Sequence, residues 1–232
     1  VISDATLNRF FAFHSLLPFV LVGLVFLHIV ALHKVGSNNP DGIEIKKNKD
    51  ENGIPKDGIP FHPYYSVKDI AGVVGFLIIF LAIVFFAPDF FGLFLEAPNF
   101  EPANPLKTPD HIAPVWYFTP FYAMLRAVPP MFGSQFPGVV VMFAAILVMF
   151  FLPWLDRSPV KSIRYKGMIF KVALAVFAVT FVVLAWLGMK PASPILTLMA
   201  QIFTTIYFAF FLLMPWYSKI DKTKPVPERV TG

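Results

Sequence analysis

The segment FFAFHSLLPFVLVGLVFLHIVALH, residues 10–33, lies between Arg9 and Lys34 and contains no lysine, arginine, aspartate or glutamate. A helix needs about 20 mostly apolar residues to cross the roughly 30 Å of hydrocarbon in a bilayer. The segment therefore predicts a membrane-spanning helix between these two basic residues.

Four further apolar runs follow this helix. They lie between Asp69 and Asp89 and at residues 136–155, 172–189 and 195–217. The whole chain is 57% hydrophobic and only 14% charged, whereas soluble domains have about 25% charged residues. None of the runs alternates polar and apolar residues as the strands of a membrane barrel do. We therefore expect an all-α integral membrane bundle with five transmembrane helices.

Basic residues are distributed unevenly between the connections of this predicted bundle. Segments 34–68, 156–171 and the tail after residue 217 contain six, five and four lysines and arginines, against four in all other segments. The positive-inside rule places the basic connections in the cytoplasm, so we expect the amino end and the 89–136 loop on the outer side. The rule also accounts for the net charge of +5. Because the basic residues form no patch with interleaved aromatics, we expect contact with membrane lipid and not with nucleic acid.

The outer loop, residues 89–136, is long and rich in proline and aromatic residues. It contains PNFEPANP at residues 98–105 and TPDHIAPVWYFTPFYAMLRAVPP at residues 108–130. The prolines exclude one continuous helix, and tryptophan and tyrosine favour the membrane interface. We expect a folded lid containing short helices.

Two histidines in the first predicted helix are candidates for ligands of a bound metal group. His14 and His28 are 14 residues apart, which places them on nearly one face of a helix and about 21 Å apart along its axis. An ionisable side chain within a span is costly and usually faces a partner or a cofactor. Imidazole is a common axial ligand of haem iron, and the chain has no cysteine. The alternative is that each histidine hydrogen-bonds a neighbouring helix. Pro18 removes the backbone hydrogen bond to the carbonyl of His14 and predicts a kink there.

Several strings of this sequence resemble the cytochrome b family in residue type and order. ATLNRFFAFHSLLPF at 5–19 and HKVGSNNPDG at 33–42 resemble the fourth transmembrane helix and its cytoplasmic exit. IPFHPYYSVKDIAG at 59–72 resembles the start of the next helix, and PANPLKTPDHIAPVWYF at 102–118 resembles the outer quinol-site loop. The resemblance covers about residues 4–130, and the remaining helices agree in number.

The resemblance implies three parts and a longer parent chain. Residues 1–35 would be a haem-ligating helix, 36–67 a cytoplasmic loop, and 68–232 the carboxy-terminal domain with four transmembrane helices. Because the chain starts at Val1 instead of a methionine, and the family's earlier helices have no counterpart, we expect a fragment. The expected location is a bacterial inner membrane, with the amino end periplasmic, in preference to the mitochondrial inner membrane.

Two b-type haems are the cofactors that the resemblance implies. His14 would ligate the low-potential haem near the outer face, and His28 the high-potential haem near the cytoplasmic face. The second ligand of each haem would come from the amino-terminal part of cytochrome b, which this sequence lacks.

A ubiquinone-reducing pocket on the cytoplasmic side is also implied by the resemblance. It would contain His33, Ser37, Lys68 and Asp69. His33 is about 140° round the helix from His28, so it is not a third ligand on the same face. A histidine and a carboxylate can supply the two protons that a reduced quinone takes up. The alternative for Lys68 and Asp69 is a solvated helix start.

A ubiquinol-oxidising pocket on the outer side would be lined by residues of the 89–136 loop. The set is Pro114, Val115, Trp116, Tyr117, Phe118 and Tyr122. The family's common pattern is Pro-Glu-Trp-Tyr, and valine replaces the glutamate at position 115. We hypothesise that Tyr117, Tyr122 or a water chain replaces that carboxylate as proton acceptor.

The function implied is that of the cytochrome b subunit of a respiratory quinol–cytochrome c oxidoreductase. Electrons would pass from quinol at the outer face through two haems to quinone at the inner face, coupled to proton translocation. The implied partners are a Rieske iron–sulfur protein and a cytochrome c-type subunit in a dimeric complex. The chain alone would not be active. The alternatives are a haem- or quinone-binding anchor of another dehydrogenase, and a transporter, which would predict two related halves.

Overall fold

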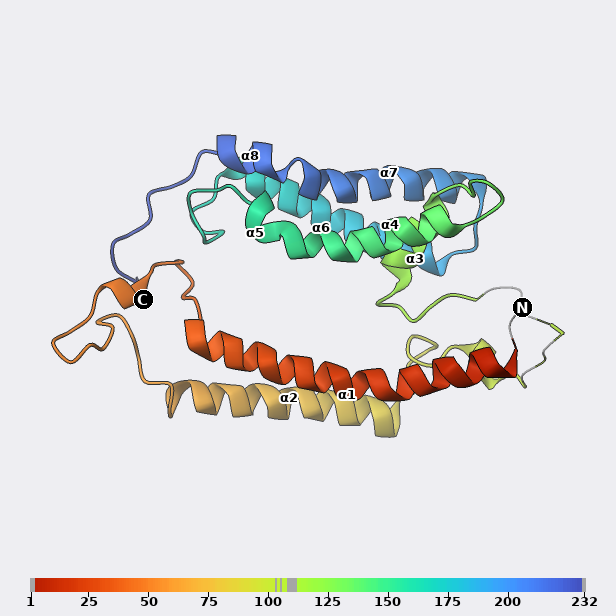
Figure 1. The fold of residues 1–232 in the computed structure, drawn as a ribbon, viewed down its shortest axis with the longest axis horizontal. Coiled ribbons are helices and arrows are strands. Elements are labelled where there is room, and N and C mark those ends of the chain that lie inside the picture. The colour runs from red at the N-terminus through yellow and green to blue at the C-terminus, as the bar shows by residue number, and fades with distance from the viewer. Residues whose placement is uncertain (1–2, 103, 105, 108–111, 231–232) are drawn as a thin grey trace.

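The computed structural model describes residues 3–102, 104, 106–107 and 112–230. Within these residues the chain forms helices and no strand, apart from two isolated bridges, Lys49–Pro55 and Met131–Ser134. Figure 1 shows two groups, with helices α1 and α2 in one and helices α3 to α8 in the other. The prediction of an all-α fold is confirmed.

Among the residues that the structure describes, five helices are long and apolar enough to span a membrane, as predicted. They cover Asp4–Val35, Tyr64–Phe86, Phe136–Leu155, Met168–Met189 and Pro194–Leu212. The first and second are α1 and α2, and the fourth and fifth are α6 and α7. The third span has the predicted bounds, whereas α1, α2 and α6 begin about a turn before their predicted starts and α7 ends five residues before residue 217.

Prolines divide the third and fifth predicted spans into shorter helices. The third consists of α4 (Phe136–Leu147), the 3-10 turn η3 (Val148–Phe151) and α5 (Leu152–Leu155). The fifth ends at Leu212 and is followed by α8, Met214–Ile220. Pro153 and Pro215 have no N–H to donate to the preceding turn, so a regular helix cannot continue through them without losing a hydrogen bond.

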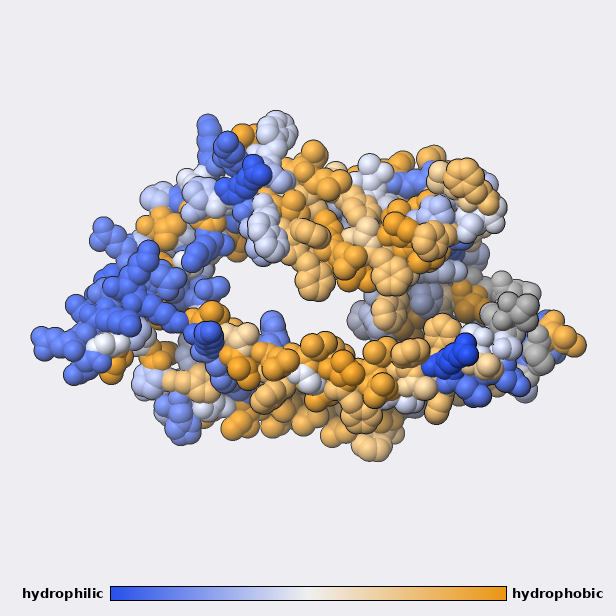
Figure 2. Space-filling model, viewed as in Figure 1, coloured by the Kyte–Doolittle hydropathy of each residue, from blue (hydrophilic) through white to orange (hydrophobic). Residues whose placement is uncertain are grey.

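Helix α1 runs without interruption through Pro18, and Figure 1 shows it bowed along its length. Neither α1 nor α2 contains a buried residue. Figure 2 shows an opening between this pair and the other helices, with apolar surface on both sides. Apolar surface of this extent needs lipid or protein to cover it.

The outer loop contains two short helices, η2 (Ala97–Phe100) and α3 (Thr119–Ala127). The short helices were predicted, but α3 is more than a lid because it packs into the bundle. Ala123 and Met124 of α3 are fully buried. They belong to a core with Leu184 of α6 and with Tyr207 and Phe211 of α7.

Two glycines allow the backbone of α3 to approach its neighbours. A Cβ on Gly188 of α6 would overlap the carbonyl oxygen of Thr119, and one on Gly138 of α4 would overlap the carbonyl oxygen of Leu125. Close backbone contact at small residues is a common way to pack helices in membranes. The start of α3 therefore lies directly against the backbone of α6.

The Gly188→Ala variant is expected to be less stable than the wild type. Alanine favours a helix over glycine by about 1 kcal/mol, but here its methyl group meets a backbone atom, and overpacking costs about 1–3 kcal/mol. Thermal unfolding in detergent measures the net loss. Gly75→Ala in α2 is the control, because a Cβ there has nothing within 4 Å. If both variants are equally stable, the contact with Thr119 does not restrict position 188.

Candidate functional site

The two candidate metal ligands lie on α1, where both imidazoles are exposed. His14 and His28 have no hydrogen bond to any residue that the structure describes. The alternative that each histidine bonds a neighbouring helix is therefore not realised within the described part of the chain. An uninterrupted helix holds the two histidines on nearly one face, about 21 Å apart.

These histidines suit a group whose remaining ligands come from elsewhere. The described residues contain no cluster of three or more histidine, aspartate or glutamate side chains that would hold a metal ion. A single imidazole at each level of the helix fits a haem iron, for which His14 and His28 would each supply one ligand.

The residues predicted for the cytoplasmic pocket lie on two helices and a loop. His33 is in the last turn of α1, Ser37 follows it, and Lys68 and Asp69 lie near the start of α2. In Figure 1 these helix ends lie at the same end of the molecule. The ammonium group of Lys68 lies 5.7 Å from the centre of the Tyr65 ring. Among the described residues, no hydrogen bond or ion pair joins the two helices at these positions.

The residues predicted for the outer pocket form a compact turn that leads into α3. The N–H of Phe118 donates to the carbonyl of Val115 at 2.8 Å, and the hydroxyl of Thr119 donates to the carbonyl of Trp116. The turn follows Pro114 and brings three aromatic rings into contact. Trp116 and Tyr117 meet edge to face at 5.5 Å, and Tyr117 and Phe118 lie 4.8 Å apart. All three rings are about half exposed.

Tyr122 lies one turn into α3 and is held by a residue that the sequence interpretation missed. The guanidinium carbon of Arg126 lies 4.7 Å from the centre of the Tyr122 ring. The same guanidinium donates to the carbonyl of Leu187 at 2.8 Å and to that of Lys190 at 3.0 Å. Arg126 thus joins the candidate site to the carboxyl end of α6. In the sequence, this contact was indicated by one feature: Arg126 follows Tyr122 by four residues, a spacing at which two side chains on one helix are neighbours.

Comparison with known families gives two overlapping matches. Residues 1–120 match the family described as cytochrome b(N-terminal)/b6/petB, and residues 102–208 match cytochrome b(C-terminal)/b6/petD.

Individual relatives agree with these matches. The chain is 75% identical to a cytochrome b of Allochromatium vinosum, over 100% of this chain and 57% of that protein. It is 47% identical to a cytochrome b of Rhodospirillum rubrum, over 100% of this chain and 54% of that protein. A solved structure of a hyperthermophilic respiratory Complex III has a TM-score of 0.80 and 39% identity, covering 96% of this chain and 53% of that one. The chain spans about half the length of these relatives.

The Arg126→Lys variant is expected to lose about 1–3 kcal/mol of stability. Lysine keeps the charge but cannot donate to two carbonyls from one planar group or stack on the Tyr122 ring in the same way. Unfolding in detergent measures the loss. Lys107→Arg, the reverse exchange at an exposed position of the same loop, is the control. A loss no larger than the control's would mean that these contacts do not fix α3 to α6.

Proposed function

This chain belongs to the cytochrome b family, and from that premise we propose that it is part of the cytochrome b subunit of a respiratory quinol–cytochrome c oxidoreductase. The observation that carries the proposal is the pair of exposed histidines, His14 and His28, on nearly one face of α1. Their spacing suits one site near each surface of the membrane.

His14 and His28 would each provide one axial ligand to a b-type haem. When bound, the two haems would supply one-electron redox chemistry at two depths of the membrane. The part of this chain in that chemistry is to hold each imidazole in place and to exclude water around it. The exposed apolar surface of α1 supports the view that the amino-terminal remainder of the family's chain packs there and brings the second ligands.

The outer turn would bind quinol and receive its proton. Trp116, Tyr117 and Phe118 offer half-exposed aromatic surface for a quinol ring, and the hydroxyls of Tyr117 and Tyr122 are the candidate proton acceptors. Val115 cannot take a proton. Arg126 lies against the ring of Tyr122 and is bonded to two carbonyls at the end of α6, so it would limit where the Tyr122 hydroxyl can lie.

The cytoplasmic set would bind quinone and supply the protons for its reduction. His33 and Asp69 would each face one carbonyl of the ring, with Lys68 and Ser37 as further polar contacts. A Rieske iron–sulfur protein, a cytochrome c-type subunit and a second copy of the complex complete the proposed assembly. Its proposed location is a bacterial inner membrane, with the amino end of α1 periplasmic.

Replacement of the α1 histidines is expected to remove haem selectively. In the purified native complex, His14→Leu should lose one of two b-type haems and His28→Leu the other, because leucine cannot ligate iron. A dithionite-reduced minus oxidised visible spectrum, with haem counted per chain, measures this.

Two histidine controls make this result specific. His62→Leu alters a loop histidine that contacts Ser66 at 3.2 Å, and it should retain both haems. His33→Leu should retain both haems and lose quinone reduction. An intact native complex without haem, or one whose haem survives both α1 replacements, would contradict the proposal.

The Val115→Glu variant tests the outer proton route. A carboxylate beside the turn offers a second acceptor, so quinol oxidation should be faster than in the wild type at neutral pH and fall back toward the wild-type rate as the carboxylate becomes protonated. Val115→Gln, which has a similar shape but takes up no proton in this range, is the matched control. If turnover and pH profile are unchanged in the glutamate variant, the side chain at position 115 does not govern the proton route.

A further inference from the structure

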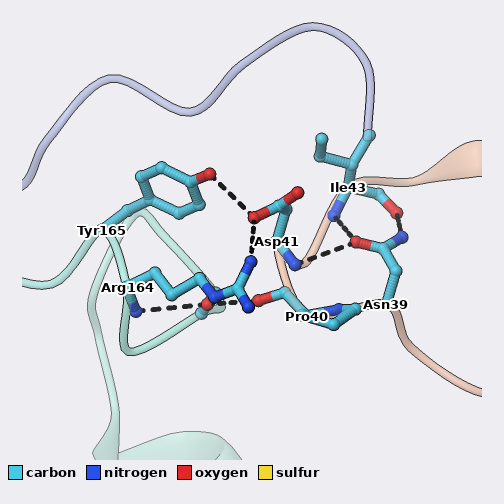
Figure 3. Close-up of polar contacts among 7 residues, drawn as sticks. Asn39, Pro40, Asp41, Ile43, Arg164 and Tyr165 are labelled. Atoms are coloured by element: carbon cyan, nitrogen blue, oxygen red, sulfur yellow. Dashed lines mark hydrogen bonds and ion pairs between the residues drawn. The ribbon is translucent and has the colours of Figure 1, made fainter. Parts of the chain in front are cut away.

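A buried carboxylate joins the exit of α1 to the other group of helices. Asp41 is only 2% exposed. One of its carboxylate oxygens accepts a hydrogen bond from the guanidinium of Arg164 at 3.0 Å and one from the hydroxyl of Tyr165 at 2.8 Å. Figure 3 shows both donors converging on Asp41 from the connection between α5 and α6. A buried carboxylate is tolerated only with such partners, and the loss of one partner is costly.

The loop around Asp41 is shaped to reach these partners. The side-chain oxygen of Asn39 accepts from the N–H groups of Asp41 at 3.2 Å and Ile43 at 3.1 Å, and its amide donates to the carbonyl of Ile43 at 2.7 Å (Figure 3). The hydroxyl of Ser162 donates to the carbonyl of Pro40 at 2.6 Å. Both sides of the contact are therefore ordered by hydrogen bonds.

The backbone approach is close at Gly42. Its φ angle is +71°, and a Cβ would lie 3.0 Å from the Cβ of Lys161 and 3.2 Å from the nitrogen of Ser162. A larger residue would be both strained and crowded there. The loop therefore lies against the backbone of residues 161–162.

The distance along the chain from α1 to this contact is short. Asp41 follows Val35, the last residue of α1, by six positions, which is at most about 21 Å of extended chain. Lys46 donates to the carbonyl of Val35, which also ties the helix end to the loop. Ser37 lies within this short segment, and His33 lies just before it.

A second tether acts farther along the same connection. Both Nε and an Nη of Arg229, in the tail, donate to one oxygen of Asp57, at 3.0 and 2.6 Å. The hydrogen bond from Arg229 lowers the pKa of Asp57, so this pair persists at neutral pH and is lost as the pH falls through that lowered pKa. The pair between Arg229 and Asp57 holds the later part of the loop, whereas Asp41 holds the part that directly follows α1.

We propose that Asp41 is a positioning residue of the cytoplasmic quinone site. By binding Arg164 and Tyr165, it fixes the segment directly after α1. That segment carries Ser37 and follows the last helical turn, which carries His33. The inference rests on the proposed function. Asp41 does not touch quinone in this proposal. It sets the location of two groups that do, and small displacements of such groups reduce rates steeply.

The test uses the native membrane complex with all its subunits. Haems are reduced, and the rate at which added ubiquinone analogue re-oxidises the cytoplasmic-side haem is followed spectroscopically. Asp41→Asn is expected to slow this step about tenfold, because an amide keeps the shape but loses the charge that pairs with Arg164. Both haems should remain, and the rate of haem reduction by quinol at the outer site should be unchanged.

The control is Glu44→Gln, the same exchange of acid for amide on the same loop. Among the described residues, the side chain of Glu44 pairs with the exposed Lys161 at 3.7 Å. Exposed pairs of this kind contribute little, so the rate in Glu44→Gln should equal that of the wild type. Tyr165→Phe removes one donor to Asp41 and should slow re-oxidation about threefold.

The outcomes separate the two proposals. A wild-type rate in Asp41→Asn with both haems present overturns the positioning role. If Asp41→Asn fails to assemble, Tyr165→Phe decides: a slowed step supports the role, and an unchanged step overturns it. A wild-type complex with no haem, or with no re-oxidation by quinone, contradicts the proposed function itself.

Discussion

The bilayer provides no water to pair with backbone N–H and C=O groups, and the whole structure follows from this constraint. Each span must satisfy its own backbone groups as a helix. The two proline breaks occur near the ends of their spans, and Figure 1 places α5 and α8 at one end of the bundle. Within α7, two polar side chains bond backbone carbonyls of neighbouring elements. Tyr207 donates to the carbonyl of Ala145, and Gln201 donates to that of Ala127, both at 2.9 Å.

Association of the helices depends on close packing and on polar contacts at their ends. Lipid chains are as apolar as leucine, so hydrophobic burial alone does not bring two spans together. In the larger group, Gly188 and Gly138 let α3 approach α6 and α4. On the opposite side, the carboxylate of Asp221 accepts from the N–H groups of Gly167 at 2.7 Å and Ile169 at 3.2 Å. These contacts make α3, α4, α6, α7 and α8 one packed unit.

The proposed chemistry is divided between this unit and the exposed pair of helices. The unit carries the aromatic turn of the proposed quinol site just before α3. The exposed α1 carries the histidines, and Asp41 joins the segment after its carboxyl end to the unit. This division fits the proposal that the haems are shared with the amino-terminal remainder of the family's chain.

The sequence by itself determined the five spans and the spacing of His14 and His28, because both follow from local periodicity and from the charge-free length of each run. It also indicated short helices in the outer loop, and the motif at residues 114–118 located the aromatic turn. Only the tertiary structure decided that α3 enters the bundle, because this depends on glycines of α4 and α6. The same holds for Arg126, whose carbonyl partners lie 61 and 64 residues away, and for Asp41, whose donors lie 123 and 124 residues away. Such contacts leave no periodic signal, since the two segments meet only after the spans between them have packed.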